Sequence, residues 1–303
     1  MKSEKTVVWL SWLIVVLALI AVGAAFLWPN DGSPFTVTSL RGQAVQIYGH
    51  GLYRYDTRFT GAANRGNDVV TLVLGIPLLI YATLLYRRGS LRGALLLLGT
   101  LVYFLYLYSS YALGVAFNPL FPVYIALFSA SLFAFVLLFA TIDRRLLADH
   151  LAPDLPRHAI AIFMVVSGLA TLVIWLVPLL NDLALNQLPA SSGTYSTKIT
   201  DVLDLGIITP VTLIAGRLIW RRNPVGYLIA FSLLVLEIML TPMIAAQTVS
   251  QLVAGITFKP AEILGPMAGF ATLGLFALWV MVVLWRKTVE TTDLPLPLQP
   301  AQG

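Results

Sequence analysis

Eight apolar stretches, each long enough to cross a lipid bilayer, occupy most of this chain of 303 residues. About 20 apolar residues in helical form cross a hydrocarbon core about 30 Å thick. Because no water reaches the backbone inside that core, each stretch must satisfy its own hydrogen bonds by forming a helix. The sequence therefore predicts an all-α, polytopic integral membrane bundle of about eight transmembrane helices. The predicted helices cover residues 7–28, 69–86, 94–116, 119–141, 159–180, 202–220, 225–247 and 263–285.

The composition agrees with a chain whose solvent is lipid. Charged residues make up 11% of the sequence, against about 25% in soluble domains. The net charge of +5 does not indicate nucleic-acid binding, because the basic residues gather at helix ends and not along one stripe. The absence of cysteine excludes disulfides, thiolate nucleophiles and cysteine metal sites. The first apolar run exceeds the about 7–15 residues typical of a signal peptide, so we expect it to be retained as a helix.

The lysines and arginines predict the orientation of the bundle. With the N-terminus inside, 13 of these residues fall in inner segments and 6 in outer segments. Basic residues concentrate on the cytoplasmic side of membrane proteins. We therefore expect a multi-pass plasma-membrane protein with its N- and C-termini in the cytoplasm. The six outer basic residues are Arg41, Arg54, Arg58, Arg65, Lys198 and Lys259.

The lengths of the connections predict two halves of four helices each. Residues 1–142 form the first half, and residues 159–287 form the second. The cytoplasmic linker between them, 143–158, contains two prolines, and the proline-rich tail 288–303 is expected to be disordered. The outer loop 29–67 of the first half contains a candidate β-hairpin cap, with a turn at Arg41 and Gly42 between two partly alternating segments.

When the sequence is aligned with itself so that Asp68 matches Asp201, the second apolar stretch falls on the sixth. We call this offset the repeat spacing. It produces eight identities within residues 68–93, including Pro77 with Pro210, and apolar composition alone does not explain the matched aspartate and proline. With four helices in each half, the repeat would be parallel, with a pseudo-two-fold axis along the membrane normal. The alternative is convergence on an acidic outer end, a mid-helix proline and a basic inner end.

Glu237 lies near the middle of the seventh apolar stretch. A charge at the bilayer centre costs about 2.5–3.5 kcal/mol or more, so this side chain must face the bundle or a water-filled cavity. It is a candidate proton, cation or substrate site, and the alternative is a buried carboxyl bonded to a neighbouring helix. Tyr103 and Tyr106 of the third stretch are candidate hydrogen-bond partners for it, although they equally fit a packing stripe.

Several acidic residues are expected to gather at the outer ends of the helices. Asp201 and Asp204 lie three residues apart and therefore share one face of the sixth helix. Asp68 takes the equivalent place on the second helix, and Glu262 opens the eighth helix from the same side. Together they predict an acidic outer vestibule. The alternative is that they cap helix N-termini, where carboxylates accept free backbone N–H groups.

Pro77 and Pro210 are candidate helix kinks. By the helical rise they lie about 13–14 Å below Asp68 and Asp201. A proline inside a helix frees a carbonyl and bends the helix, and interrupted helices line the midplane sites of transporters. Prolines are also common in ordinary membrane helices.

Three functions remain open on the sequence alone. The first is a conduit or transporter for a small solute, proton or cation, with the acidic vestibule and Glu237 as its pathway. The second is a sensor or assembly protein that binds a membrane-protein partner through the outer loop 29–67. The third, a membrane enzyme at the outer leaflet, is less favoured. Its candidate residues are Asp56, Asp68, Asp201 and Asp204 for acid–base chemistry, and Arg54, Arg58 and Arg65 for an anionic head group.

No sequence motif indicates a cofactor, a metal or a nucleic acid. The three histidines, His50, His150 and His158, fall in loops, with no pair at ligand spacing within the membrane. The bilayer is therefore the one partner that the sequence predicts firmly.

Overall fold

The computed structural model describes residues 2–186 and 192–289 of the chain, and 76% of it is helical. Within these residues, eight helices are long and apolar enough to cross a membrane. The predicted fold class, an all-α polytopic membrane helix bundle, is confirmed. The candidate spans are Glu4–Leu27, Arg58–Arg87, Leu91–Gly114, Phe121–Thr141, Arg157–Ala184, Ile199–Trp220, Pro224–Val253 and Met267–Lys287.

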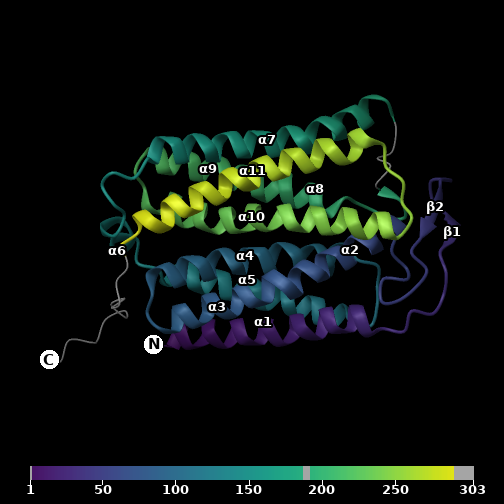
Figure 1. The fold of residues 1–303 in the computed structure, drawn as a ribbon, viewed down its shortest axis with the longest axis horizontal. Helices are drawn as coiled ribbons and strands as arrows, with labels where there is room; N and C mark the ends of the chain where they lie inside the picture. Colours follow the sequence, from purple (N-terminus) through teal and green to yellow (C-terminus); the bar gives the residue numbers. More distant parts are fainter. Residues whose placement is uncertain (1, 187–191, 290–303) are drawn as a thin grey trace.

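The long helices lie side by side, with a small hairpin at one end of the bundle (Figure 1). We call this end the hairpin end, and we call the opposite end, where α1 begins and α6 lies, the arginine end. The elements of the first part of the chain are α1 (Lys2–Leu27), β1 (Phe35–Thr38), β2 (Ala44–Ile47), α2 (Arg58–Val70), the π-helical turn η1 (Thr71–Gly75), α3 (Ile76–Arg87), α4 (Leu91–Gly114), α5 (Phe121–Thr141) and α6 (Arg144–Asp149). Those of the second part are α7 (Arg157–Ala184), α8 (Ile199–Leu203), the π-helical turn η3 (Asp204–Ile208), α9 (Thr209–Trp220), α10 (Pro224–Val253) and α11 (Pro260–Lys287).

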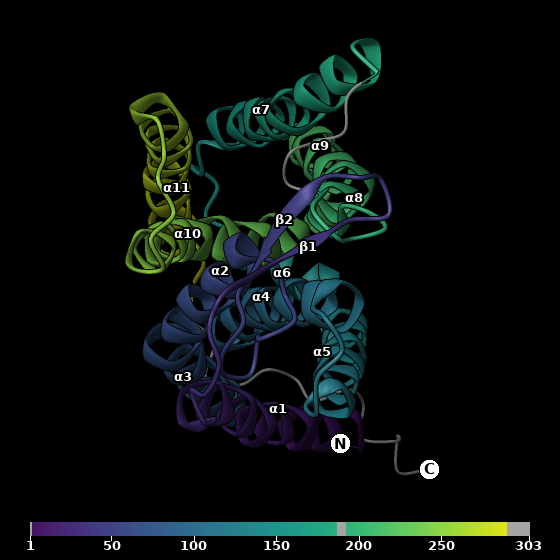
Figure 2. The same ribbon diagram turned by 90° about the vertical axis from the view of Figure 1, so that its right-hand side faces the viewer.

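Two groups of helices stand next to each other when the bundle is seen from the hairpin end (Figure 2). We call α1–α5 the first half and α7–α11 the second half. Helix α10 packs against α2 and α4 of the first half as well as α9 and α11 of its own. Small residues permit this close approach: a Cβ on Gly66 of α2 would lie 2.5 Å from the backbone of Ala246 in α10.

Helix boundaries recur in the two halves at the repeat spacing. The turn η1 begins at Thr71 and η3 begins at Asp204, and each is followed by a helix of 12 residues, α3 or α9. Pro77 and Pro210 are the second residues of those helices. A proline ring clashes with the carbonyl four residues earlier and donates no hydrogen bond, and π turns are recurrent sites of helix bending. The two segments thus match in backbone geometry as well as in residue identities.

The segment between α1 and α2 contains an antiparallel hairpin, in which Phe35 lies opposite Ile47 and Thr38 lies opposite Ala44. The expected end of the outer loop at residue 67 is wrong, because α2 already begins at Arg58. This polar stretch is helical because the side chain of Thr57 caps it and its small residues pack against α10.

The start of the C-terminal tail is held at the arginine end. Thr288 is fully buried and forms a β-bridge with Leu151, and the Val289 amide donates to the His150 carbonyl at 2.8 Å. The expectation of disorder is therefore wrong for these two residues. Residues 290–303 lie outside the described part of the chain.

Candidate functional site

A cavity of about 510 Å³ lies between the two halves. Its walls come from α2 and α4 on one side and from α7, α8, η3, α9, α10 and α11 on the other. Tyr195 and Phe258 border it at the hairpin end, and Ser167, Thr212 and Glu237 border it deeper in the bundle. Because Glu237 lies near the middle of the 30-residue α10, the cavity reaches the middle of the spans.

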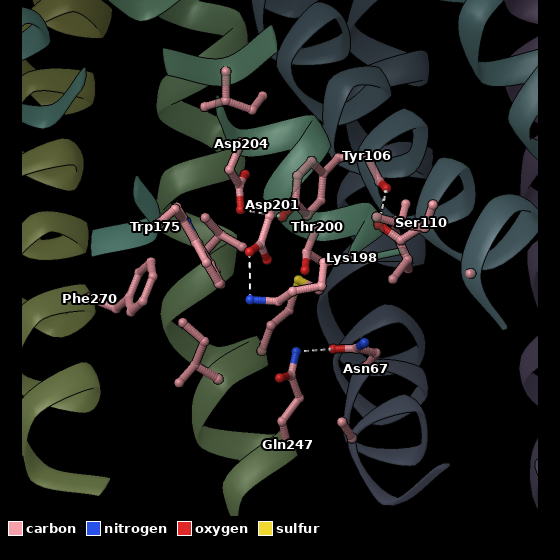
Figure 3. Close-up of a pocket in the computed structure, with 18 of the residues that line it drawn as sticks. Asn67, Tyr106, Ser110, Trp175, Lys198, Thr200, Asp201, Asp204, Gln247 and Phe270 are labelled. Carbon is pink, nitrogen blue, oxygen red and sulfur yellow. Dashed lines mark hydrogen bonds and ion pairs between the residues drawn. The ribbon is translucent and has the colours of Figure 1, made fainter. Parts of the chain in front are cut away.

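An ion pair occupies the hairpin end of this cavity (Figure 3). The Lys198 Nζ lies 2.6 Å from the Asp201 Oδ2, and the Asp201 side chain is only 5% exposed. The other oxygen, Oδ1, has no hydrogen-bond partner among the described residues. No side chain caps the N-terminus of α8, although Asp201 lies in the first turn, where a carboxylate complements the helix dipole. The cavity therefore contains a buried carboxylate with unused acceptor capacity.

Asp204 lines the same cavity, three residues further along the chain. The Tyr106 hydroxyl of α4 donates to the Asp204 Oδ2 at 3.2 Å, across the interface between the halves. The expectation that Tyr106 pairs with Glu237 is wrong. Its hydroxyl contacts η3 of the second half, where Asp204 begins the π-helical turn.

Glu237 is bonded to α7. The Ser167 hydroxyl donates to the Glu237 Oε1 at 2.7 Å, and both residues line the cavity. The expected pairing of Tyr103 with Glu237 is also wrong, because the Tyr103 hydroxyl lies 2.8 Å from the Thr71 Oγ1 in its own half. Glu237 thus faces the bundle interior, as the cost of a charge in lipid requires.

Other polar and aromatic residues complete the walls and carry no motif in the sequence. The Gln247 Nε2 donates to the Asn67 Oδ1 at 2.7 Å, which joins α10 to α2. Trp175 of α7 and Phe270 of α11 border the cavity on the side opposite Tyr106 (Figure 3). Of the lining residues that the sequence analysis did not propose, only Lys198 could have been found from the sequence, because it lies three residues before Asp201 and can pair with it on a helix.

Asp68 does not line the cavity, so its place in the predicted vestibule is wrong. It lies within α2, well after the helix start at Arg58, and is therefore not an N-terminal cap. Its carboxyl is buried in the first half, where the Tyr53 hydroxyl donates to Oδ2 at 2.7 Å and the Tyr111 hydroxyl lies 3.4 Å from Oδ1. Tyr103 belongs to this aromatic interior and is likewise absent from the cavity wall.

Asp56 joins the connections of the two halves at the hairpin end. Its Oδ1 accepts hydrogen bonds from the Tyr195 hydroxyl at 2.7 Å and from the Ala116 amide at 2.9 Å. Burial raises the pKa of Asp56 to about 6, although both hydrogen bonds lower it. Because Tyr195 lies three residues before Lys198, this contact anchors the segment that carries the cavity's lysine.

The residues expected for an outer-leaflet enzyme do not all converge: Asp201 and Asp204 share the cavity, and the others lie elsewhere. Asp56 and Asp68 lie outside the cavity. Arg58 Nε donates to the Ala254 carbonyl at 2.8 Å, and Arg65 Nη1 donates to the Ala25 carbonyl at 3.2 Å. These two guanidinium groups are therefore engaged by backbone carbonyls of this chain.

The side chain of Glu262 lies outside the described residues. Among the side chains that the structure describes, no group of three or more histidine, aspartate or glutamate residues is placed to hold a metal ion. Searches against protein-family models, curated proteins and solved structures found no match for this chain.

Proposed function

We propose that this multi-pass membrane protein is a conduit or transporter for a small solute, which enters the cavity from the hairpin end. The observation that carries this proposal is the continuous cavity that extends from Tyr195 and Phe258 to Glu237. Small-molecule sites are typically apolar hollows of about 300–1,000 Å³ with a few polar groups, and this cavity matches that description. Ionisable residues within the spans are costly, and they usually mark a pathway or binding site.

In this proposal the hairpin end faces the outside of the cell, as the distribution of 13 inner and 6 outer basic residues predicts. Asp201 and Asp204 then form an acidic vestibule, and Glu237 is the deeper carboxylate that binds a proton or cation. Ser167 holds Glu237 in the cavity wall through its hydroxyl. Release of that hydrogen bond would let the carboxyl exchange its proton or cation with a bound solute.

The second half supplies the part that can move. Helices α7 and α11 make few contacts with each other, whereas their counterparts α1 and α5 pack closely. Ser167 lies on α7, and Phe270 lies on α11, so each helix of the loosely joined pair contributes to the cavity wall. A shift of α7 against α9 and α10 would open the arginine end, which a conduit requires.

Single-cysteine accessibility tests the proposal without knowledge of the solute. The chain has no cysteine, so Thr171→Cys and Thr212→Cys each introduce one thiol into the cavity wall. In proteoliposomes, a membrane-impermeant cationic methanethiosulfonate should modify both thiols rapidly from the hairpin end and more slowly from the arginine end. Val173→Cys, on α7 but 58% exposed and outside the cavity, is the matched control and should resist modification.

Two outcomes would overturn the conduit. Modification from the hairpin end alone would indicate a closed receptor or sensor pocket, and no modification from either side would indicate that water does not enter. The role of Glu237 is tested in the Thr212→Cys variant. Adding Glu237→Gln should leave only the pH dependence that ionisation of the introduced thiol produces, while adding the cavity-lining change Ile244→Val should preserve any further pH dependence.

A further inference from the structure

We propose that the cavity takes a small organic cation with an apolar body, whose ammonium group replaces Lys198 at Asp201. This inference rests on the proposed function in one respect, namely that the cavity is a solute site. It adds the chemical class of the solute and assigns Lys198 the role of a built-in competitor.

The first argument is the unused acceptor at Asp201. This residue is 4% exposed, and its Oδ1 lacks a hydrogen-bond partner among the described residues. A buried carboxylate is costly unless it is paired and hydrogen-bonded. Its one contact, with the Lys198 Nζ at 2.6 Å, uses only Oδ2. A ligand with an ammonium group and more than one N–H donor could engage both oxygens.

The second argument is the balance of charge in the cavity wall. Three carboxyl groups, those of Asp201, Asp204 and Glu237, line it, and Lys198 supplies the one basic side chain among the described lining residues. Two of the carboxyl groups already accept one hydroxyl each, from Tyr106 and Ser167. In their ionised forms these carboxyl groups repel anions and attract cations, which favours a cation as the ligand.

The third argument is the aromatic and aliphatic remainder of the wall. Trp175 and Phe270 stand beside the ion pair on one side, and Tyr106 stands on the other (Figure 3). Tryptophan faces attract cations because the electron density of the ring is negative above its plane. Leu236 and Leu240 extend an apolar surface below. The wall therefore suits a cation that carries an apolar body, and it does not suit a bare metal ion.

The Lys198 ammonium can leave Asp201 when a ligand ammonium takes its position. Its side chain is 22% exposed, whereas that of Asp201 is 5% exposed, so the lysine reaches solvent and the carboxylate does not. A lysine ammonium is a compact charge on a flexible stem. Exchange of this ammonium for that of a ligand keeps Asp201 paired throughout, which avoids the cost of an uncompensated buried charge.

Three molecules with the same phenyl body and different charge test the proposal on the purified full-length chain. They are 2-phenylethylammonium, neutral 2-phenylethanol and anionic 3-phenylpropanoate, and binding is measured by calorimetry and by the shift in Tm. We expect the cation to bind at least tenfold more tightly than the other two. Equal affinity for the cation and the alcohol would overturn the inference.

Two variants separate the roles of Lys198 and Asp201. A tethered group acts at an effective concentration in the millimolar range, so Lys198→Gln should raise the affinity for the cation about tenfold. Lys198→Arg should retain the competition and leave the affinity near that of the natural chain. Unchanged or weaker binding by Lys198→Gln would contradict the role of the lysine as competitor.

Asp201→Asn should abolish binding of the cation. Because that variant leaves Lys198 without its partner, the double change Lys198→Gln with Asp201→Asn provides a neutral pair in case the single variant fails to fold. The double variant should also fail to bind the cation, and retained binding would overturn the inference. The cysteine labelling described above fails independently. Labelling from both ends without cation binding would support the conduit and overturn the cation as its ligand. Cation binding with labelling from one end alone would support the cation site and overturn the conduit.

Discussion

The two halves share a topology but differ in their interiors. In α4 of the first half, Tyr103 and Tyr111 are almost completely buried and fill the space between helices. One repeat spacing later, α10 of the second half carries Leu236 and Ile244, and both line the cavity. Protein interiors are close-packed, so smaller side chains at matching positions leave space unless the helices collapse. The smaller side chains at these positions, together with the wider separation of α7 and α11, leave the hollow open.

The charged pairs at matching positions also differ between a filled interior and a cavity wall. Arg65 and Asp68 of the first half correspond, at the repeat spacing, to Lys198 and Asp201 of the second. Arg65 turns toward the Ala25 carbonyl at the end of α1, which leaves tyrosine hydroxyls to bond Asp68. Lys198 turns inward to Asp201. In the first half the carboxylate is enclosed by tyrosines, and in the second half the carboxylate pairs with a lysine at the cavity wall.

The two halves also differ in how their outer helices meet. In the first half α1 packs closely against α5, whereas in the second half α7 packs against α9 and α11 packs against α10, with few contacts between α7 and α11. The helix boundaries around Pro77 and Pro210 nevertheless match at the repeat spacing.

The largest expected effect is the loss of the aromatic filling. Tyr111→Ala should lower the free energy of unfolding by about 3–5 kcal/mol, because a large buried ring is removed and Asp68 loses a donor. The matched change Ile244→Ala, in the cavity wall, should cost less than about 2 kcal/mol. Unfolding in mixed detergent micelles measures both. Equal losses would show that the halves are equally well packed.

The next effect concerns Asp56, the anchor between the two halves. Its folded pKa of about 6 exceeds its ordinary value of 3.8, so the native state binds more protons between these values. Stability is then fully retained below pH 3.8 and declines as the pH rises through about 6, by about 3 kcal/mol. Tm measured from pH 4 to 8 should show this decline, and Asp56→Asn should flatten it. A curve unaffected by Asp56→Asn would assign the titration to another group.

Removal of charge should distinguish the two matched aspartates. Asp68→Asn should destabilise the protein by about 1–3 kcal/mol, because a carboxyl that accepts two tyrosine hydroxyls is replaced. Asp201→Asn should change stability by less than about 1 kcal/mol, since it removes a buried and incompletely bonded charge at the expense of one ion pair. Chemical unfolding of both variants provides the measurement. A larger loss at Asp201 would contradict the difference between the halves.

The smallest effect on stability comes from copying the first half into the second. Leu236→Tyr places the counterpart of Tyr103 in the cavity, where space exists, so we expect a change below about 1 kcal/mol. Labelling of Thr171→Cys from the hairpin end should nevertheless fall about tenfold in rate, because the ring fills the hollow. Leu236→Met, of similar volume to the natural residue, is the control. Unaltered labelling would show that this position does not control the cavity.

Much of the bundle was predictable from local properties of the chain. The spans follow from apolar length, and the constant spacing between matching segments is visible in the identities of Asp68 with Asp201 and Pro77 with Pro210. The early start of α2 at Arg58 was missed because its polar residues resemble a loop. That segment is helical only because α10 lies against its small residues.

The candidate site was less accessible to sequence analysis. Asp68 and Asp201 look equivalent in the sequence, yet one is enclosed by tyrosines and the other borders a cavity. The tyrosine predicted for Glu237 bonds Asp204, and Glu237 instead uses Ser167, a residue with no distinguishing pattern around it.

The sequence by itself determined that the chain is a membrane bundle with matching segments in its two halves, and that Glu237 must avoid lipid. These conclusions depend on the length of apolar runs and the cost of a charge in hydrocarbon, which are properties of each segment alone. Only the tertiary structure decided which carboxyl groups share a cavity, which lysine faces them and which helices enclose the hollow. The physical reason is that hydrogen-bond partners and internal volume arise from side chains of helices far apart in the chain, and helix packing decides which of them meet.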